Sequence, residues 1–169
     1  MPPNGRFLFT ATENALYQGG PAATVSNGSP ARILRYNLQT GRLDRQWTYE
    51  TDPVAEPPVP ANQFSVNGLV ELLPLNNEFL IAMERSFSVG APGTGNTIKL
   101  YRISLSRAGS ASKTPLLNLD KLGIPLDNVE GMTFGPRLPD GRRSVVLVSD
   151  NNFAASQFSQ FLLFALDRR

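Results

Sequence analysis

The apolar positions of the chain fall in short runs, and three of these runs end at an acidic residue: Phe7–Glu13, Phe79–Glu84 and Val145–Asp150. Each is followed by a second apolar run that closes on a leucine, at Arg32–Leu38, Ile98–Leu105 and Phe161–Leu166. Short apolar runs bounded by turn residues are typical of β-strands. The pattern therefore predicts strands that repeat along the chain.

Two further sets of segments extend the repeat. Asn67–Leu72 and Glu130–Gly135 precede the second and third acid-ended runs, and the more polar segments Leu43–Tyr49 and Pro115–Leu119 follow the first two leucine-ended runs. About four short strands per repeat are typical of a β-propeller blade. Loops rich in Gly, Pro, Ala and Ser, at 19–30, 53–60 and 90–95, account for the length of each repeat.

We therefore expect an all-β fold: a partial β-propeller of about three four-stranded antiparallel blades. The blades are placed at about 5–50, 64–120 and 127–169 of one domain that covers residues 1–169. A closed propeller needs about four to eight blades, so the ring is not expected to close alone, and its open edges invite pairing with another chain. A β-sandwich with duplicated strands is the alternative, because short strands with frequent turn signals also suit that fold.

Composition supports a globular, turn-rich protein: 41% of the residues are hydrophobic, 18% are charged, and Gly and Pro number 14 each. The formal net charge is only +2 and the arginines are scattered, which disfavours nucleic acid as a partner. The segment Met1–Arg6 does not resemble a signal peptide. No apolar stretch reaches the roughly 20 residues of a membrane span, and the cellular location stays unassigned.

The chain contains no cysteine and no histidine. This excludes disulfides, thiolate chemistry, catalysis by a histidine acid or base, and ordinary zinc or iron sites. A metal ion would have to be a hard cation that binds oxygen atoms.

The acid-ended runs supply candidate ligands for such a cation. Residues at equivalent repeat positions of a propeller meet at one mouth of the channel, so Glu13, Glu84 and Asp150 are expected to converge and to repel one another unless a cation lies among them. Calcium takes about 6–8 oxygen ligands, including side-chain amides. Further candidate ligands are Asn14, Asn67, Asn128, Glu130, Asn151 and Asn152.

Glu130 and Asp150 lie in the densest polar segments, Asp127–Gly131 and Ser149–Phe153, and are the candidate catalytic residues. Asp and Asn at strand ends also cap turns, and we expect that simpler role for Asp127, Asn76 and Asn77. A phosphate or another anion could bind Arg85, Lys99 and Tyr101. Solvated charges on a strand face are the simpler interpretation of these three residues.

The segments Asn128-Val129-Glu130-Gly131-Met132 and Ser149-Asp150-Asn151-Asn152-Phe153 make the chain resemble the phytase-like family, often labelled as having esterase-like activity of phytase. Weaker matches run in order through Glu13–Leu16, Ser29–Tyr36, Asn67–Leu69 and Met83–Ser86. The resemblance implies a propeller. By likeness to calcium-dependent propeller phytases, it also implies a hydrolase of phosphoric or other esters, in which metal ions polarise phosphoryl oxygens and activate water.

Members of that family are usually about twice as long and often carry an export signal, and this chain matches their C-terminal part. Two hypotheses follow. The first is a phytase-like segment with calcium-dependent hydrolase activity on a phosphorylated or ester small molecule. The second is a non-catalytic interaction module, or a truncated half-propeller that self-associates to complete a ring.

Overall fold

The computed structural model describes residues 5–167, and the chain divides into two compact units, Met1–Leu126 and Asp127–Arg169. Met1–Asn4, on which most of the signal-peptide expectation rests, lie outside the described residues, as do the last two residues of the predicted third blade. No helix within residues 5–167 is long and apolar enough to cross a membrane.

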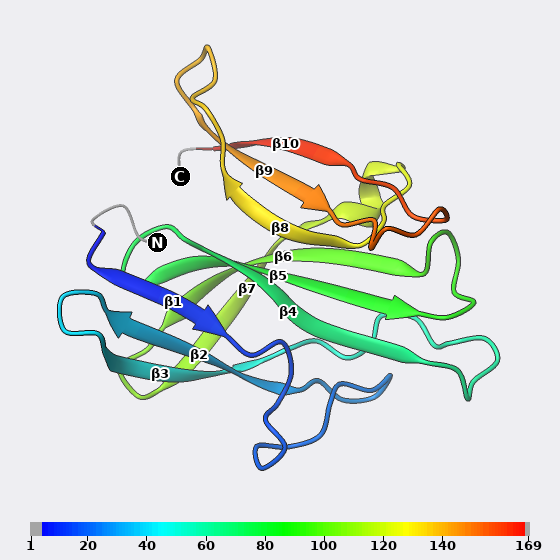
Figure 1. Cartoon of the computed structure of the whole chain (residues 1–169), viewed down its shortest axis with the longest axis horizontal. Coiled ribbons are helices and arrows are strands. Elements are labelled where there is room, and N and C mark those ends of the chain that lie inside the picture. Colours follow the sequence, from blue (N-terminus) through cyan, green and yellow to red (C-terminus); the bar gives the residue numbers. More distant parts are fainter. Residues whose placement is uncertain (1–4, 168–169) are drawn as a thin grey trace. The chain divides into compact units, whose positions relative to one another are not determined.

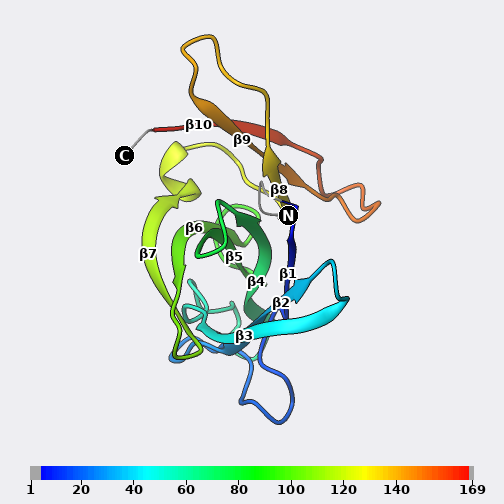
Figure 2. The same ribbon diagram turned by 90° about the vertical axis from the view of Figure 1, so that its left-hand side faces the viewer.

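The first unit is built on one sheet of seven strands (Figure 1). The strands are β1 (Phe7–Ala11), β2 (Pro30–Asn37), β3 (Arg42–Glu50), β4 (Ser65–Pro74), β5 (Phe79–Ser88), β6 (Asn96–Leu105) and β7 (Ser110–Asn118), followed by the 3₁₀ turn η1 (Leu119–Leu122). Their order across the sheet is β1-β2-β3-β7-β6-β5-β4. The seven strands curl into a nearly closed, barrel-like sheet, which Figure 2 shows end on.

The core of this unit lies inside the curled sheet. Alternate residues of each strand point inward, because successive side chains of a strand face opposite sides. The buried inward residues include Ile33 of β2, Leu80 of β5 and Ile103 of β6. Each is fully buried, which stabilises the fold by about 1.5–3 kcal/mol per side chain. Trp47 closes the core and donates its indole N–H to the carbonyl of Ser106 over 2.7 Å.

The separate blades that the sequence predicted are not detected among residues 5–167. Strands β1–β3 and β4–β7 each run antiparallel, as expected, but β3 and β7 pair in parallel, with Thr48 opposite Ser110 and Tyr49 opposite Ala111. This short pairing joins the first two repeat units into one sheet. The structure also differs from the β-sandwich alternative, because a sandwich has two separate sheets and the seven strands here belong to one continuous sheet. The all-β class itself is confirmed.

The second unit is a three-stranded antiparallel sheet of order β10-β9-β8. Its strands are β8 (Val129–Phe134), β9 (Arg143–Ser149) and β10 (Phe161–Leu166). The loop between β9 and β10 is fixed to the start of β8, because Asp127 Oδ2 accepts the main-chain N–H of Phe158 over 2.9 Å. All ten strands of the described residues fall on segments that the apolar pattern predicted.

Candidate functional site

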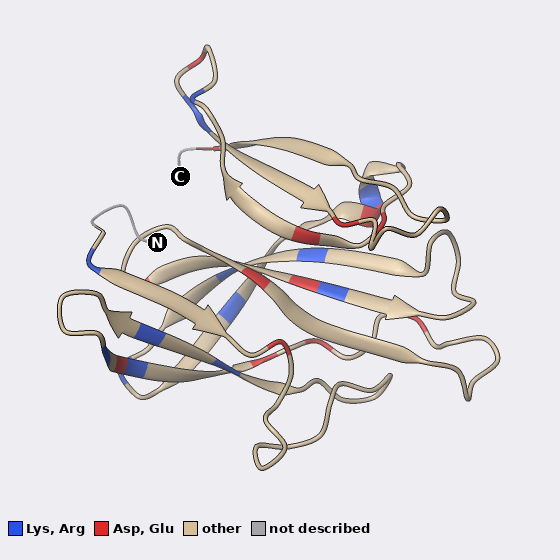
Figure 3. Cartoon of the chain, viewed as in Figure 1, with Lys and Arg blue, Asp and Glu red and all other residues tan. Residues whose placement is uncertain are grey.

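The main group of buried charges in the first unit surrounds Glu84, at the inner face of β5. We call it the Glu84 cluster; its members are Tyr49, Asp52, Asn67, Glu84, Lys99, Tyr101 and Lys113. Five strands and the loop after β3 contribute to it. Figure 3 shows acidic and basic positions next to each other on β5 and a basic position on β6.

Glu84 is only 1% exposed, yet both of its carboxylate oxygens are satisfied. Oε1 accepts the Tyr49 hydroxyl at 2.6 Å and Lys113 Nζ at 2.7 Å. Oε2 accepts the main-chain N–H of Asp52 at 2.8 Å and Asn67 Nδ2 at 2.9 Å. A buried carboxylate is tolerated only with such partners.

Asp52 forms the second centre of the cluster, at its more open side. Its Oδ1 lies 2.6 Å from Lys113 Nζ and its Oδ2 lies 3.0 Å from Lys99 Nζ. The Tyr101 hydroxyl also donates to Oδ2. Two carboxylates and two ammonium groups therefore balance one another in charge. The side chains of Asp52 and Lys99 are 28% and 31% exposed, so solvent reaches this part of the cluster.

These contacts shift the pKa values of three groups. Burial alone raises the pKa of Asp52, but hydrogen bonds from Lys113, Tyr101 and Lys99 outweigh it and lower the pKa to about 2. Burial, followed by the charge of Glu84, raises the pKa of Tyr49 far above its ordinary value. Burial and the hydrogen bond to Asp52 raise the pKa of Tyr101 in the same direction. Asp52 is thus a carboxylate and both phenols stay protonated at neutral pH.

Strand β5 also anchors the loop that carries Asp52. Ser86 Oγ accepts the N–H of Ala55 over 2.9 Å, and Ser88 Oγ donates to the carbonyl of Glu56 over 2.6 Å. Glu84, Ser86 and Ser88 are successive inward positions of β5. A narrow gap with no room for a water molecule remains beside them, lined by Asp52, Ala55, Asn67, Glu84, Ser86, Thr97 and Lys99.

The structure brings four of the predicted site residues together: Glu84, Asn67, Lys99 and Tyr101. Their partners Tyr49, Asp52 and Lys113 were missed from the sequence. Arg85 faces the opposite side of β5 and lies 4.0 Å from Glu13, so the contact between Arg85 and Glu13 lies outside the Glu84 cluster. The Asn14 side-chain oxygen is buried without a hydrogen-bond partner in residues 5–167.

The remaining predicted residues lie in the second unit. Asn128 is buried, and its carbonyl accepts the N–H of Asp150 over 2.9 Å. Asp150 Oδ1 accepts the N–H of Asn152, and Asn151 Oδ1 accepts the N–H of Phe153. Glu130 is half-buried on β8. Because Glu13 and Glu84 belong to one unit and Asp150 to the other, the meeting of these three carboxylates stays a prediction.

Turn capping is confirmed for two residues for which we expected it. Asn76 Oδ1 accepts the N–H groups of Glu78 and Phe79 at 2.8 and 2.9 Å. Asp127 binds the N–H of Asn128 with Oδ1, at 2.8 Å, and the N–H of Phe158 with Oδ2. These contacts account for both residues as structural.

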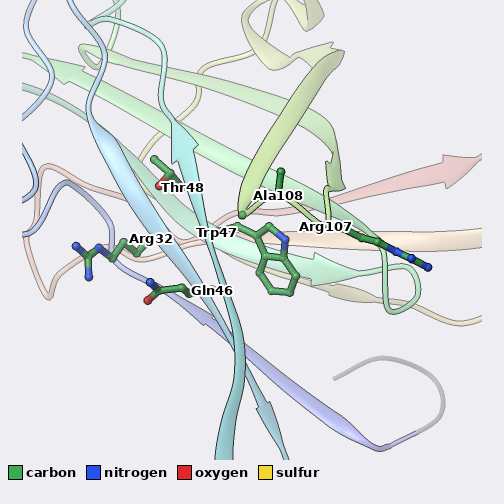
Figure 4. A pocket seen from close by; sticks show the side chains of 7 residues that line it. Arg32, Gln46, Trp47, Thr48, Arg107 and Ala108 are labelled. Carbon is green, nitrogen blue, oxygen red and sulfur yellow. The ribbon is translucent and has the colours of Figure 1, made fainter.

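A wider hollow of about 470 Å³ lies where β3 meets β7. It is lined by Arg32, Gln46, Trp47, Thr48, Arg107, Ala108 and Gly109. Figure 4 shows the side chains of Arg32 and Arg107 pointing away from each other. The two guanidinium groups therefore do not form a clamp for one anion.

A comparison with protein-family models finds a match to the family described as "Phytase-like: Esterase-like activity of phytase", over residues 1–153. Comparisons with curated proteins and with solved structures find no match. The family match includes the whole of the Glu84 cluster and the first four residues of the loop between β9 and β10, Asp150–Phe153.

Proposed function

The chain belongs to the phytase-like family, and from this premise we propose that the protein hydrolyses esters, with phosphoric esters as the preferred class. The family match over residues 1–153 is the observation that carries the proposal. Three donors of the Glu84 cluster support the proposal, because such donors also bind phosphate groups. Lys99, Lys113 and the Tyr101 hydroxyl all contact the Asp52 carboxylate, in a part of the first unit that solvent reaches.

For the chemical step we propose Asp150 and Glu130, the two carboxylates singled out from the sequence. Asp150 is exposed at the end of β9, and one of its oxygens is held by the N–H of Asn152. A carboxylate in such a position can act as a general base toward water. Arg85, which faces the opposite side of β5 from the Glu84 cluster, stays a prediction from the sequence.

The residues of the Glu84 cluster do not fit a calcium ion. Both oxygens of Glu84 are occupied by donors, and two ammonium groups already balance the carboxylates. Among residues 5–167 no group of three or more acidic side chains is placed to hold a metal ion. Calcium stays a prediction from the family resemblance, and no step is assigned to it.

Turnover of a small phosphomonoester and of a small carboxylic ester by the whole chain tests the proposal, with added calcium and with a chelator. Asp150→Asn and Glu130→Gln are expected to lower kcat by about a hundredfold or more, the lower end of what a general acid or base contributes. Asp120→Asn, an exposed carboxylate on η1, is the matched control and should change nothing. Absence of turnover of both substrates under all conditions contradicts the proposal.

A second function, that of an interaction module, is favoured by β10. This edge strand carries no charge between Phe161 and Leu166, and the side chains of Phe161 and Leu163 are 75% and 59% exposed. Unprotected apolar edges pair readily with other strands. We propose that a second copy of the chain pairs with this edge strand.

Sedimentation velocity over a range of protein concentrations tests this second function. The wild-type chain is expected to dimerise, and Leu163→Lys to stay monomeric because a charge is placed in the paired edge. Leu38→Lys, at an exposed leucine of the other unit, is the control. A wild-type chain that remains monomeric at every concentration rules the assembly out.

A further inference from the structure

Three hydrogen-bond donors of the first unit converge on the carboxylate of Asp52. Lys113 Nζ lies 2.6 Å from Oδ1, Lys99 Nζ lies 3.0 Å from Oδ2, and the Tyr101 hydroxyl also donates to Oδ2. Two ammonium groups and one phenol around a single carboxylate are the donor set that proteins use to bind a free anion. In this structure the protein's own side chain occupies the position of the anion.

The donors and the carboxylate come from different kinds of structure. Lys99 and Tyr101 lie on β6, and Lys113 lies on the adjacent strand β7, opposite Ile103. The Lys113 ammonium is also held over the ring of Tyr101, 4.5 Å from its centre. Asp52, in contrast, belongs to the loop after β3. The donor set is therefore fixed by paired strands, independently of Asp52.

The Asp52 side chain can leave this position while its main chain stays. Its N–H is bound by Glu84 Oε2 at 2.8 Å, and its carbonyl accepts Asn67 Nδ2 at 2.7 Å. Neither bond involves the side chain. Rotation of the Asp52 carboxylate toward solvent leaves two lysines facing one carboxylate, that of Glu84, and thus an excess positive charge.

We propose that Lys99, Lys113 and Tyr101 form an anion site that Asp52 fills in the free protein and that a phosphate group takes in its place. This inference rests on the proposed function and concerns a phosphate site within the first unit alone. A tetrahedral phosphate dianion offers an acceptor to each of the three donors and carries more charge than the carboxylate it displaces. Asp52 acts as an internal competitor and sets how tightly the phosphate binds.

Isothermal titration calorimetry of the whole chain with inorganic phosphate, and separately with a small phosphomonoester, tests the site. Asp52→Ala should bind phosphate at least tenfold more tightly than the wild type. The double variant Asp52→Ala/Lys99→Ala should lose that gain. Asp120→Ala removes the same charge from an exposed position and should leave the affinity as in the wild type.

Equal phosphate affinity of folded Asp52→Ala and of the wild type overturns the proposal, as does an equal gain in Asp120→Ala. If circular dichroism shows that Asp52→Ala does not fold, Asp52→Asn replaces it under the same criteria. The readout with inorganic phosphate is binding and involves no turnover. A chain that binds phosphate but hydrolyses no ester therefore loses the proposed function and keeps the site.

Discussion

The Tyr49 hydroxyl donates to Glu84 Oε1 over 2.6 Å, and both side chains are almost completely buried. Tyr49 lies on β3 and Glu84 on β5, so the bond connects the two antiparallel groups that form the curled sheet. Lys113 of β7 forms an ion pair with the same oxygen. The polar cluster is thus part of the core and ties together strands that are far apart in the sequence.

Replacement of Glu84 by Gln should destabilise the first unit strongly. The change leaves Lys113 with one carboxylate in place of two, in surroundings where removal of one partner of a buried ion pair costs about 3–5 kcal/mol. Glutamine keeps the shape and part of the hydrogen bonding, so we expect a loss of about 2–4 kcal/mol in urea unfolding. Glu78→Gln, at an exposed turn, should stay within about 0.5 kcal/mol of the wild type.

Acid should weaken the fold through Asp52. Its pKa is about 2 in the folded protein, below the ordinary value of 3.8, so its contribution to stability is complete above about pH 4 and is lost as the pH falls toward 2. Because Asp52 is partly exposed, we expect a loss of only about 1 kcal/mol. Urea midpoints measured between pH 5 and pH 2 should show a smaller decrease for Asp52→Asn. Identical slopes for the two proteins would count against the assigned contacts.

Alkali should weaken the fold through Tyr49 and Tyr101. Burial raises the pKa of both phenols above the ordinary tyrosine value of about 10. The unfolded chain therefore ionises first as the pH rises beyond about 10, and the contribution of each phenol to stability, complete below that pH, is lost. Tyrosinate absorbance should therefore rise in two stages, the later one together with unfolding. In Tyr49→Phe the later stage should shrink. Full ionisation while circular dichroism remains native would contradict the buried hydrogen bonds.

Removal of the Ser88 hydroxyl should loosen the loop that carries Asp52. Ser88→Ala takes the hydrogen-bond donor from the Glu56 carbonyl, at a cost of about 1 kcal/mol. Limited proteolysis should cut within residues 51–62 faster than in the wild type. Ser112→Ala, an exposed serine on β7, is the control and should leave the cleavage rate unchanged. Equal rates in Ser88→Ala and the wild type would show that the anchor does not hold the loop.

The apolar pattern predicted the strands well because it depends on neighbouring residues. It placed Phe79–Arg85 and Ile98–Leu105 on strands that are adjacent in the structure. It failed on the arrangement of the units, because the parallel pairing of Thr48 with Ser110 joins segments some sixty residues apart without a local signal. The repeat therefore predicted separate blades where the structure has one curled sheet.

The candidate site was predicted only in part, because several of its residues carry no local signal in the sequence. Glu84 and Asn67 were recognised by their repeat positions, and Lys99 and Tyr101 by their chemistry. Asp52 was missed because it precedes the proline-rich segment 53–60, which reads as a plain loop, and Lys113 because it lies in the polar sequence of β7. The signal available in advance was weak: an isolated lysine between Ser112 and Thr114 in a polar segment.

The most direct test of the anion site is a crystal structure of Asp52→Ala grown with tungstate, a heavy analogue of phosphate. We predict an anomalous peak between Lys99 Nζ, Lys113 Nζ and the Tyr101 hydroxyl, with the Glu84 contacts unchanged. A folded variant in which the three donors turn to other partners, with tungstate bound elsewhere or nowhere, would contradict it.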